Sequence, residues 1–293
     1  MALEIAPEEI KLFEDHIRNY AGLVFKGAQE ELFKKRILMR VEANSLGSVK
    51  DYYHFLRFDP KKDEEIKILL NLVTVNETYF FREPPQIEML KNEFLPMIKK
   101  EKQGLPNKRL RIWSAACSTG AEPYTIAILI LESGLFNPGE WTIEIFASDI
   151  NTEALNIAKQ GIFNEFDFRS TEENMRKKYF TPDGAKSLKI DKKLIDMVKF
   201  SRLNFFNSKE ISIMKDIDLI LCRNALIYFD TEGKQEIVKN FYTSLNPGGY
   251  LLIGQTESLF KVTTLYDMKP MSKVILYQKP AKTPTEKNTL PNR

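Results

Sequence analysis

The sequence predicts an α/β protein with a doubly wound, mostly parallel sheet, preceded by a small all-helical domain. Three observations predict this fold class. From residue 8 to residue 72, apolar residues recur at helical spacing and no strand pattern occurs. After about Gln103, strand-like runs alternate with helical stretches of about 10 to 15 residues, as in a parallel sheet with helices on both faces. From Arg111 to Ile130, an apolar strand runs into a small-residue turn and then a helix.

The helical domain is expected to contain four helices joined by short breaks. In the first helix, Ile10, Phe13 and Ile17 repeat at the spacing of one helical face. Leucine and phenylalanine occupy the equivalent positions of the others, so we expect these faces to form one core. The predicted helices are residues 8–25, 30–43, 49–58 and 63–73.

The sheet is expected to contain six strands, and helices follow several of them. The stretch between the last two strands carries no helical pattern, so we expect this pair to be antiparallel. The predicted strands are residues 110–114, 141–148, 198–202, 217–222, 249–256 and 273–278, and the predicted helices are residues 123–133, 152–159 and 232–245.

Changes of composition divide the chain into segments. The alternation of strands and helices is interrupted by a polar helix and short strand-like pieces around a Pro-Asp-Gly turn, which indicate a small β-rich insertion. The last residues are rich in proline, threonine and lysine, as in a disordered tail. The predicted segments are a helical domain over 1–75, a linker that covers the ligand site over 76–107, the sheet domain over 108–279 with its insertion at about 165–200, and the tail over 280–293.

The composition is that of an ordinary soluble protein, with 293 residues, 43% hydrophobic and 28% charged. No apolar run approaches the roughly 18 to 20 residues of a membrane helix, and the acidic first residues lack the features of a signal peptide. With only two cysteines, we expect a cytoplasmic protein without membrane insertion. The net charge of +3 is too small to indicate a nucleic-acid partner.

Both histidines, His16 and His54, lie in the first fifth of the chain. The predicted sheet domain therefore has no Ser-His or Cys-His pair and no histidine to bind a metal. Most hydrolase mechanisms are excluded, and we expect no metal site.

The turn after the first predicted strand indicates which cofactor the sheet binds. It has a single glycine, Gly120, and no lysine, which excludes a P-loop and the three-glycine dinucleotide turn. Glu122 follows two positions later and would repel a pyrophosphate, whereas a carboxylate suits hydroxyls or a cation. S-adenosylmethionine offers ribose hydroxyls, a sulfonium and an amino group without phosphate. We expect Ala116, Gly120 and Glu122 to border it.

Two further positions fit the same cofactor. Asp149 ends the second predicted strand about thirty residues after Gly120, where doubly wound folds place the acid that binds ribose hydroxyls. Ile150 follows it, and Asp149 could equally cap the next helix. After the third strand, the Asn204 amide and the Phe205 ring suit an adenine, although a turn with core phenylalanines is the simpler interpretation.

Polar residues also appear at the end of the fourth strand, where Arg223 and Asn224 follow Cys222. They could be structural, but together beside a cofactor cleft they favour function. Tyr228 lies one helical turn beyond Asn224. The DPPY-type sequence of amino-group methyltransferases is absent, which argues against nucleobase N-methylation. Before the sheet, the polar residues Asn76, Thr78 and Arg82 stand among aromatics, in either a functional segment or an amphipathic linker.

Five ordered motifs, NETYFFRE, RIWSAACSTGAEPYTIA, FASDIN, CRNALIYFD and LNPGGYLLIGQTES, together resemble the CheR-type chemotaxis receptor methyltransferases. The resemblance covers nearly the whole chain. It implies a class I methyltransferase fold, S-adenosylmethionine as cofactor and S-adenosylhomocysteine as product. It also implies methylation of glutamates on the cytoplasmic helices of methyl-accepting chemotaxis receptors, which gives methyl esters in chemotaxis adaptation.

The resemblance implies a role for particular residues, with Arg82 and Tyr228 nearest the reacting carboxylate. Ala121 departs from the family, which usually has a second acid there. The turn FTPDGAKSL is shorter than in members that dock on a receptor's C-terminal peptide, which argues against such tethering. The cofactor contacts that the resemblance implies are Asn76, Thr78, Arg82, Glu122, Asp149, Asn204, Phe205, Arg223 and Asn224.

The implied reaction needs no general base, because a glutamate with a pKa of about 4.3 is already ionised at neutral pH. Catalysis would depend on proximity and orientation, with Arg82 orienting the carboxylate and Tyr228 donating a hydrogen bond near the transferred methyl group.

A basic stretch of the second helix, Lys34, Lys35, Arg36 and Arg40, is either a solvated face or a docking face for acidic receptor helices. Three alternative functions stay open from the sequence. The chain could methylate a carboxyl group of another protein or a small molecule, bind S-adenosylmethionine as a regulator without turnover, or, as a weaker alternative, methylate RNA.

Overall fold

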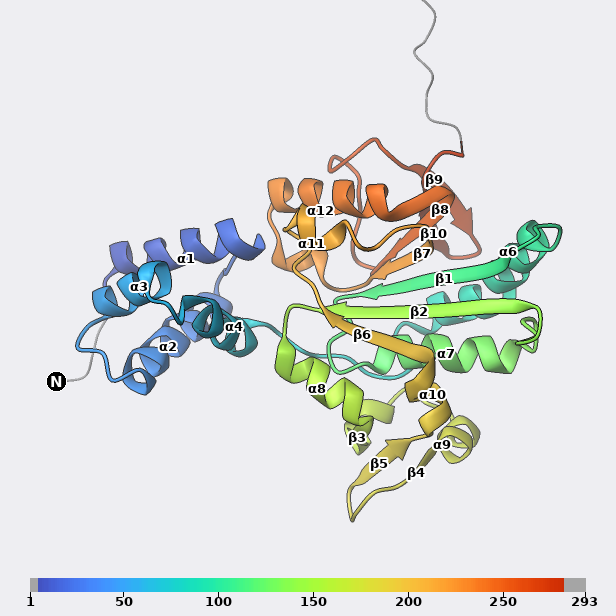
Figure 1. Cartoon of the computed structure of the whole chain (residues 1–293), viewed down its shortest axis with the longest axis horizontal. Helices are drawn as coiled ribbons and strands as arrows, with labels where there is room; N and C mark the ends of the chain where they lie inside the picture. The colour runs from blue at the N-terminus through green and yellow to red at the C-terminus, as the bar shows by residue number, and fades with distance from the viewer. Residues whose placement is uncertain (1–4, 282–293) are drawn as a thin grey trace, which may run out of the picture.

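The structure is a computed structural model that describes residues 5–281. A helical domain lies beside a larger sheet domain, and a small sheet projects from the latter (Figure 1). The predicted disordered tail over 280–293 lies almost wholly outside the described residues. Across the described part of the chain, the helices are too short or too polar to cross a membrane.

The helical domain contains the four helices that the sequence predicts. Their apolar faces form one core, in which the rings of Phe13 and Tyr52 stack with centroids 5.7 Å apart. The third helix begins at Ser48, whose side chain accepts a hydrogen bond from the Asp51 amide. The helices are α1 (Pro7–Ala21), α2 (Ala28–Ala43), α3 (Val49–Phe58) and α4 (Lys62–Val73).

Arg40 of α2, one of the four cations of the expected docking face, is half-buried and pairs with a carboxylate of the helical domain. Its guanidinium donates to both carboxylate oxygens of Glu65, at 2.8 and 2.7 Å, and the Tyr52 hydroxyl donates to the same carboxylate at 2.7 Å. Burial alone would raise the pKa of Glu65, but these hydrogen bonds lower it below its ordinary value. The sequence pattern could not show this pairing, because Glu65 lies 25 positions away.

The main sheet has seven strands in the order β6-β2-β1-β7-β8-β10-β9. The first five are parallel, while β10 runs antiparallel to both β8 and β9, as predicted for the end of the sheet. The predicted fold class is confirmed. The strands are β1 (Lys108–Ala115), β2 (Trp141–Asp149), β6 (Val198–Arg202), β7 (Ile217–Cys222), β8 (Leu245–Ile253), β9 (Asp267–Met271) and β10 (Val274–Gln278).

Helices cover both faces of this sheet, with α11 and α12 on one side and α7 and α8 on the other (Figure 1). Alternate residues of β1 therefore enter two cores, Ile112 on the side of α7 and Trp113 on the side of α12. This double burial explains the continuous apolar runs of the central strands. The helices are α7 (Ala121–Ser133), α8 (Thr152–Gln160), α11 (Ser208–Ile211) and α12 (Thr231–Ser244).

Several elements were not predicted, among them the short helix α11, a helical run before the sheet and the edge strand β9. A long helical run fills most of the expected linker: α5 (Pro84–Met89), a π-helical turn η1 (Leu90–Phe94) and α6 (Leu95–Lys102). Pro96, which interrupts regular helical hydrogen bonding, and the π turn obscure its period. Strand β9 lies at the sheet edge and is mostly exposed, so it lacks an apolar alternation.

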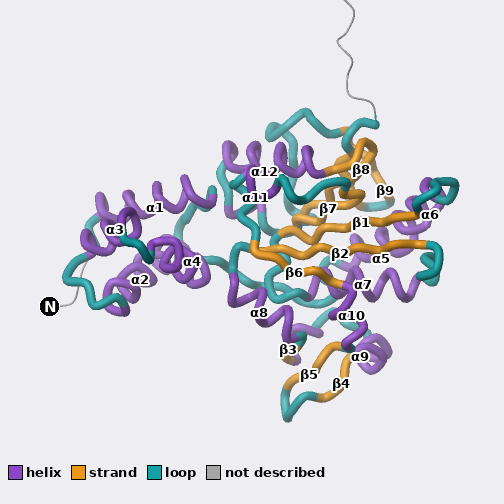
Figure 2. The backbone as a smooth tube through the Cα atoms, in the orientation of Figure 1, coloured by secondary structure: helices purple, strands orange, loops and turns teal. Residues whose placement is uncertain are grey.

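The insertion between α8 and β6 forms a separate three-stranded antiparallel sheet (Figure 2). Its strands occur in the order β3-β5-β4, and it begins a few residues before the predicted start. The insertion ends slightly before the predicted position of about residue 200, because residues from Val198 onward belong to the main sheet. The elements are β3 (Ile162–Asn164), η2 (Glu165–Phe168), α9 (Glu173–Tyr179), β4 (Phe180–Pro182), β5 (Ser187–Ile190) and α10 (Lys192–Met197).

Replacing Arg40 with alanine is expected to lower the free energy of unfolding by about 3 kcal/mol, because Glu65 would stay buried without its cation. Since the folded protein lowers the pKa of Glu65, the pair stabilises above the ordinary carboxylate pKa and is lost as the pH falls below it. The difference between wild type and variant should therefore shrink in acid. Urea denaturation at pH 7 and in acid measures both effects.

Lys35→Ala is the control, because this lysine of the same helix is exposed. It should change the free energy of unfolding by less than about 0.5 kcal/mol. Equal effects of the two substitutions would show that Arg40 has no structural role.

Candidate active site

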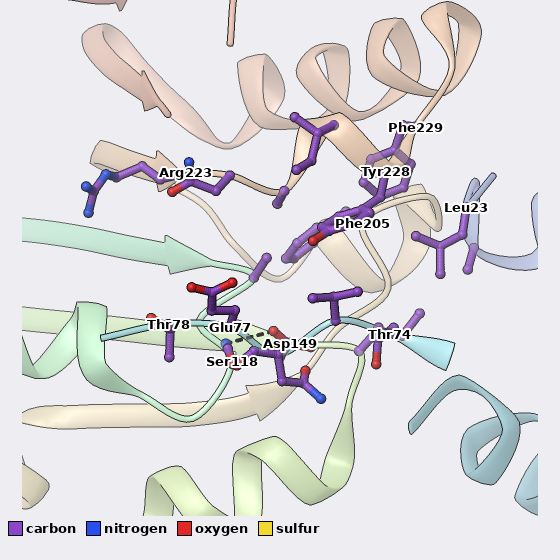
Figure 3. A pocket seen from close by; sticks show the side chains of 18 of the residues that line it. Leu23, Thr74, Glu77, Thr78, Ser118, Asp149, Phe205, Arg223, Tyr228 and Phe229 are labelled. Atoms are coloured by element: carbon purple, nitrogen blue, oxygen red, sulfur yellow. Dashed lines mark hydrogen bonds between the residues drawn. The ribbon is translucent and has the colours of Figure 1, made fainter. Parts of the chain in front are cut away.

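A cavity of about 510 Å³ lies where the carboxyl ends of β1, β2 and β7 meet the helical domain. Ligands bind at this edge in open α/β sheets, and the volume is within the range of about 300 to 1,000 Å³ for small-molecule sites. Figure 3 shows Tyr228, Phe205 and Phe229 on one side of the cavity and Asp149, Ser118 and Thr78 on the other.

The loop between β1 and α7 has an unusual backbone. Ala116 and Ser118 both have positive φ angles, 63° and 49°, which non-glycine residues seldom adopt. Gly120 has φ 91°, and a Cβ there would stand 2.8 Å from the Cβ of Ala158. Gly120 is not among the residues that line the cavity; its conformation permits the turn that starts α7, and its expected contact with the cofactor stays a prediction. Ala116 and Ser118 do line the cavity.

Asp149 is held by backbone amides at the end of β2. Its carboxylate accepts from the amides of Ser118, at 2.8 Å, and Asn151, at 2.9 Å. The alternative role as a helix cap belongs to Asn151, whose side chain accepts from the Ala154 amide. Burial raises the pKa of Asp149, and the backbone hydrogen bonds counteract that rise. Asp149 lines the cavity beside Ile150, which also packs against the helical domain's core.

Glu122 stands in the first turn of α7 and faces the same cavity. The Ser114 hydroxyl donates to its Oε1 at 2.7 Å, and an Nη of Arg223 donates to its Oε2 at 3.2 Å. Burial raises the pKa of Glu122, whereas Arg223 lowers it. A carboxylate in the cavity wall whose hydrogen-bonding capacity is only partly used is suited to a ligand that carries a cation or hydroxyl groups.

Arg223 is buried and acts mainly on its protein neighbours. Its guanidinium donates to Gln86 Oε1 at 2.6 Å, to Glu122, to Glu83 and to the Arg82 carbonyl. Figure 3 shows this side chain directed away from Tyr228. Arg223 lines the cavity but chiefly holds the groups around it.

Asn224 comes next and has φ 57°, another rare backbone conformation. Its side-chain Nδ2 donates to Glu83 Oε1 at 3.0 Å, while its Oδ1 is buried without a hydrogen-bond partner among the described residues. The bond to Glu83 holds Asn224 in the cavity wall.

Asn204 and Phe205 form a turn that closes the cavity after β6. The Asn204 side chain donates to the Tyr20 carbonyl at 2.6 Å and accepts from the Phe206 amide at 3.0 Å. This side chain therefore holds the turn and joins it to the helical domain. The Phe205 ring lines the cavity while packing edge-on against Trp113.

Arg82 and Tyr228 also line the cavity. Arg82 stands between two residues with positive φ angles, Phe81 and Glu83, and donates to the Glu77 carbonyl at 2.9 Å. Tyr228 ends the short 3-10 turn η3 (Leu226–Tyr228). Burial raises the pKa of Tyr228, so its hydroxyl keeps the proton at neutral pH.

The segment before α5 crosses the cavity and brings Asn76 and Thr78 to its wall. The Ser118 hydroxyl donates to the Asn76 carbonyl at 2.9 Å, which joins this segment to the loop after β1. Its role as a cover of the cofactor is a prediction that this contact supports.

The helical domain supplies a wall of the cavity that the sequence did not indicate. Leu23 forms a β-bridge with Phe229, and the Val24 amide donates to the Tyr228 carbonyl at 3.0 Å. Both residues line the cavity together with Phe25 and Gln29. No periodic pattern marks such a contact, because it joins segments about two hundred positions apart.

The charges around the cavity favour a cationic ligand. Four carboxylates line it against two guanidiniums, so the wall is acidic. Lysine and histidine do not occur among the described residues that line it. The lining carboxylates are Glu77, Glu83, Glu122 and Asp149, and the guanidiniums are Arg82 and Arg223.

The strand order, the antiparallel last strands and the acidic cavity at the carboxyl ends of the strands define a class I methyltransferase with S-adenosylmethionine as cofactor. The family model "CheR methyltransferase, SAM binding domain" matches residues 76–275, and "CheR methyltransferase, all-alpha domain" matches residues 8–74. The chain therefore belongs to the CheR methyltransferase family.

Named relatives agree with this assignment. Chemotaxis protein methyltransferase 2 of Vibrio cholerae is 36% identical over 276 residues, which cover 92% of both chains. The chemotaxis protein methyltransferase of Borreliella burgdorferi is 34% identical, over 85% of this chain and 90% of its own. That of Vibrio parahaemolyticus is 30% identical, over 94% of this chain and 98% of its own.

Apart from Gly120, the structure gathers the predicted site residues around one cavity. Sequence reasoning missed Glu83 and Gln86, which contact Arg223, and Ser118, which binds Asp149. Glu83 ends the motif NETYFFRE and Ser118 lies within the first loop motif, so both stood in segments already recognised without an assigned role.

Glu122→Gln is expected to weaken the binding of S-adenosylhomocysteine by about 10- to 100-fold, because a charge-assisted hydrogen bond contributes about 1.5 to 3 kcal/mol. Isothermal titration calorimetry measures the affinity. Glu132→Gln, near the other end of α7, is the matched control and should bind as the wild type does. Unchanged affinity of the Glu122 variant would remove this residue from the cofactor site.

Proposed function

We propose that this protein transfers the methyl group of S-adenosylmethionine to glutamate side chains on the cytoplasmic helices of methyl-accepting chemotaxis receptors. The observation that carries the proposal is that Arg82 and Tyr228 border the same cavity as the acidic cofactor wall. A carboxylate entering there would meet a guanidinium and a phenol beside the reacting methyl group. The names of the relatives support a role in chemotaxis.

The reaction is a direct displacement. A carboxylate oxygen of the substrate forms a bond to the methyl carbon while the bond from that carbon to sulfur breaks, and S-adenosylhomocysteine leaves. No proton is transferred, because the glutamate is ionised at neutral pH. The absence of histidine and lysine from the described cavity wall is therefore no obstacle.

The residues of this chain have three tasks in such a reaction. Glu122 and Asp149 hold the cofactor, Arg82 orients the incoming carboxylate and Tyr228 donates a hydrogen bond beside the transferred methyl group. Arg82 must not bind the carboxylate too strongly, since extra stabilisation of the ground state raises the barrier. Arg82 already donates one hydrogen bond to the Glu77 carbonyl, so only its remaining N–H groups can bind the substrate.

Arg82→Ala and Tyr228→Phe are each expected to lower kcat for labelled methyl transfer to receptor cytoplasmic fragments by about 100-fold, because orientation of the reacting groups is lost. The transferred label should be released as methanol in mild alkali, as methyl esters are and methyl amines are not. Tyr53→Phe, in α3, is the control. Full activity of both variants with normal cofactor binding would sink the proposed roles.

The substrate surface is proposed to include α2. Lys35 is exposed on this helix, whereas Lys34 forms ion pairs with Glu30 and Glu31 of the same helix. Arg36 is half-buried beside Met39. Lys35 and Arg36 are thus the cations best placed to meet an acidic receptor helix, which would place the enzyme in the cytoplasm with its substrate.

Lys35→Glu is expected to raise the KM for receptor fragments several-fold at low salt, with little change in kcat, because charges at an interface rim mainly affect association. The effect should fade as salt is added. Lys50→Glu, an exposed lysine of α3, is the matched control. Identical kinetics of the Lys35 variant and wild type at low salt would reject this docking face.

Receptor fragments with and without their C-terminal tails should be methylated at similar rates, since the short turn of the insertion argues against tethering.

A further inference from the structure

A half-buried carboxylate outside the predicted site, Glu257, binds the loop that carries Tyr228. Its Oε2 accepts from the amides of Gly254, at 2.7 Å, and Asn224, at 2.8 Å. Its Oε1 accepts from the Ile227 amide at 3.2 Å. Among the described residues, Glu257 forms no ion pair, so backbone amides are its main partners. These contacts join the loop after β8 to the loop after β7.

The contacts fix an unusual backbone conformation. Asn224 has φ 57° and precedes the turn η3, whereas the Ile227 amide lies within this turn, next to Tyr228. Gly254 packs closely against the same atoms, because a Cβ at this position would stand 2.8 Å from the Asn224 nitrogen and 2.8 Å from Glu257 Oε2. A side chain at position 254 would therefore push against the loop and the carboxylate that binds it.

This loop presents two groups to the cavity. The side-chain nitrogen of Asn224 donates to Glu83 Oε1, which holds this residue in the cavity wall. Four positions later stands the Tyr228 ring. The far end of the turn is fixed from the helical domain by the Val24 amide. Glu257 supplies the corresponding attachment at the near end.

We propose that Glu257 is a positioning residue for methyl transfer, which holds the Asn224–Tyr228 loop so that Tyr228 stands beside the reacting methyl group. The proposal rests on the proposed function. Glutamine is not an equivalent here: its Nε2 would set N–H groups against backbone N–H donors, so one side of the clamp would be lost.

The test is Glu257→Gln, with Glu210→Gln as the matched control. Glu210 also accepts a backbone amide, that of Asn204 at 2.9 Å, but it supports the turn on the other side of the cavity. We expect Glu257→Gln to lower kcat at saturating cofactor by about 10- to 100-fold, because misplacement by about 1 Å costs that much. Glu210→Gln should mainly raise the KM for the cofactor. Equal effects on kcat, or none, would overturn the proposal.

A double-mutant cycle shows whether Glu257 acts through Tyr228. In the Tyr228→Phe background, Glu257→Gln should lower kcat much less than it does in the wild type, because the effects of residues that act as a unit are not additive. Fully additive losses would indicate general damage to the fold and reject the proposal. If Glu257→Gln does not fold, Gly254→Ala perturbs the same loop with the carboxylate intact and should give the same loss of kcat.

Amide hydrogen exchange tests the clamp without turnover. In the protein bound to S-adenosylhomocysteine, Glu257→Gln should speed exchange at the Asn224 or the Ile227 amide, whichever faces the new Nε2, while the Asn204 amide stays protected. Unchanged exchange at both amides would overturn the clamp. If wild-type protein transfers no methyl group to receptor fragments, the proposed function fails; if wild type is active and Glu257→Gln has the same kcat, only the positioning role fails.

Discussion

The buried guanidinium of Arg223 is the interaction on which the rest of the site depends. It lies just beyond β7, and its hydrogen bonds reach the first turn of α7 through Glu122 and the start of α5 through Glu83 and Gln86. Gln86 in turn donates to the Ile253 carbonyl at the end of β8. A cation removed from water needs such partners, since an unpaired buried charge is strongly destabilising. The hydrogen bonds that satisfy the Arg223 guanidinium therefore fix the positions of the elements around the cavity relative to one another.

Two carboxylates of this region, Asp149 and Glu257, are also satisfied by hydrogen bonds, but their partners are backbone amides and not a charged side chain. Asp149 is held by two such amides and Glu257 by several, and each carboxylate thereby fixes a loop whose own sequence lacks regular structure. The positive φ angles of Ala116, Ser118 and Asn224 occur in these loops. Strained backbone persists only where its surroundings determine it, and in these three residues of the cavity wall the buried polar contacts supply that constraint.

The fold could be predicted to a large extent, because it follows from local patterns. The four helices of the first domain repeat apolar residues at helical spacing, and the central strands are continuous apolar runs. Asp149 and Glu122 stand at strand and helix ends that these patterns locate. The helical run from Pro84 escaped prediction because a proline and a π turn disturb its period. Strand β9 escaped because its residues are mostly exposed at an edge.

Which side chains contact one another could not be predicted from the sequence, for a different reason. Whether Arg40 faces solvent or Glu65, and whether Asn204 meets a ligand or the Tyr20 carbonyl, depends on which helix lies opposite. Gly120 illustrates the same limit: the sequence located the loop, but the close approach of α8 that excludes a side chain at this position appears only in the structure.

The contacts of residues 20–25 with the Asn204 turn and the Tyr228 loop also bear on how the protein assembles. The hydrogen bond from Asn204 to the Tyr20 carbonyl closes a chain segment of 184 positions. Contacts of such sequence separation form late, because loop closure opposes them until other structure has shortened the path. The cavity has its last wall only where the two domains meet, so the integrity of the binding site depends on domain contact as well as on the fold of each domain.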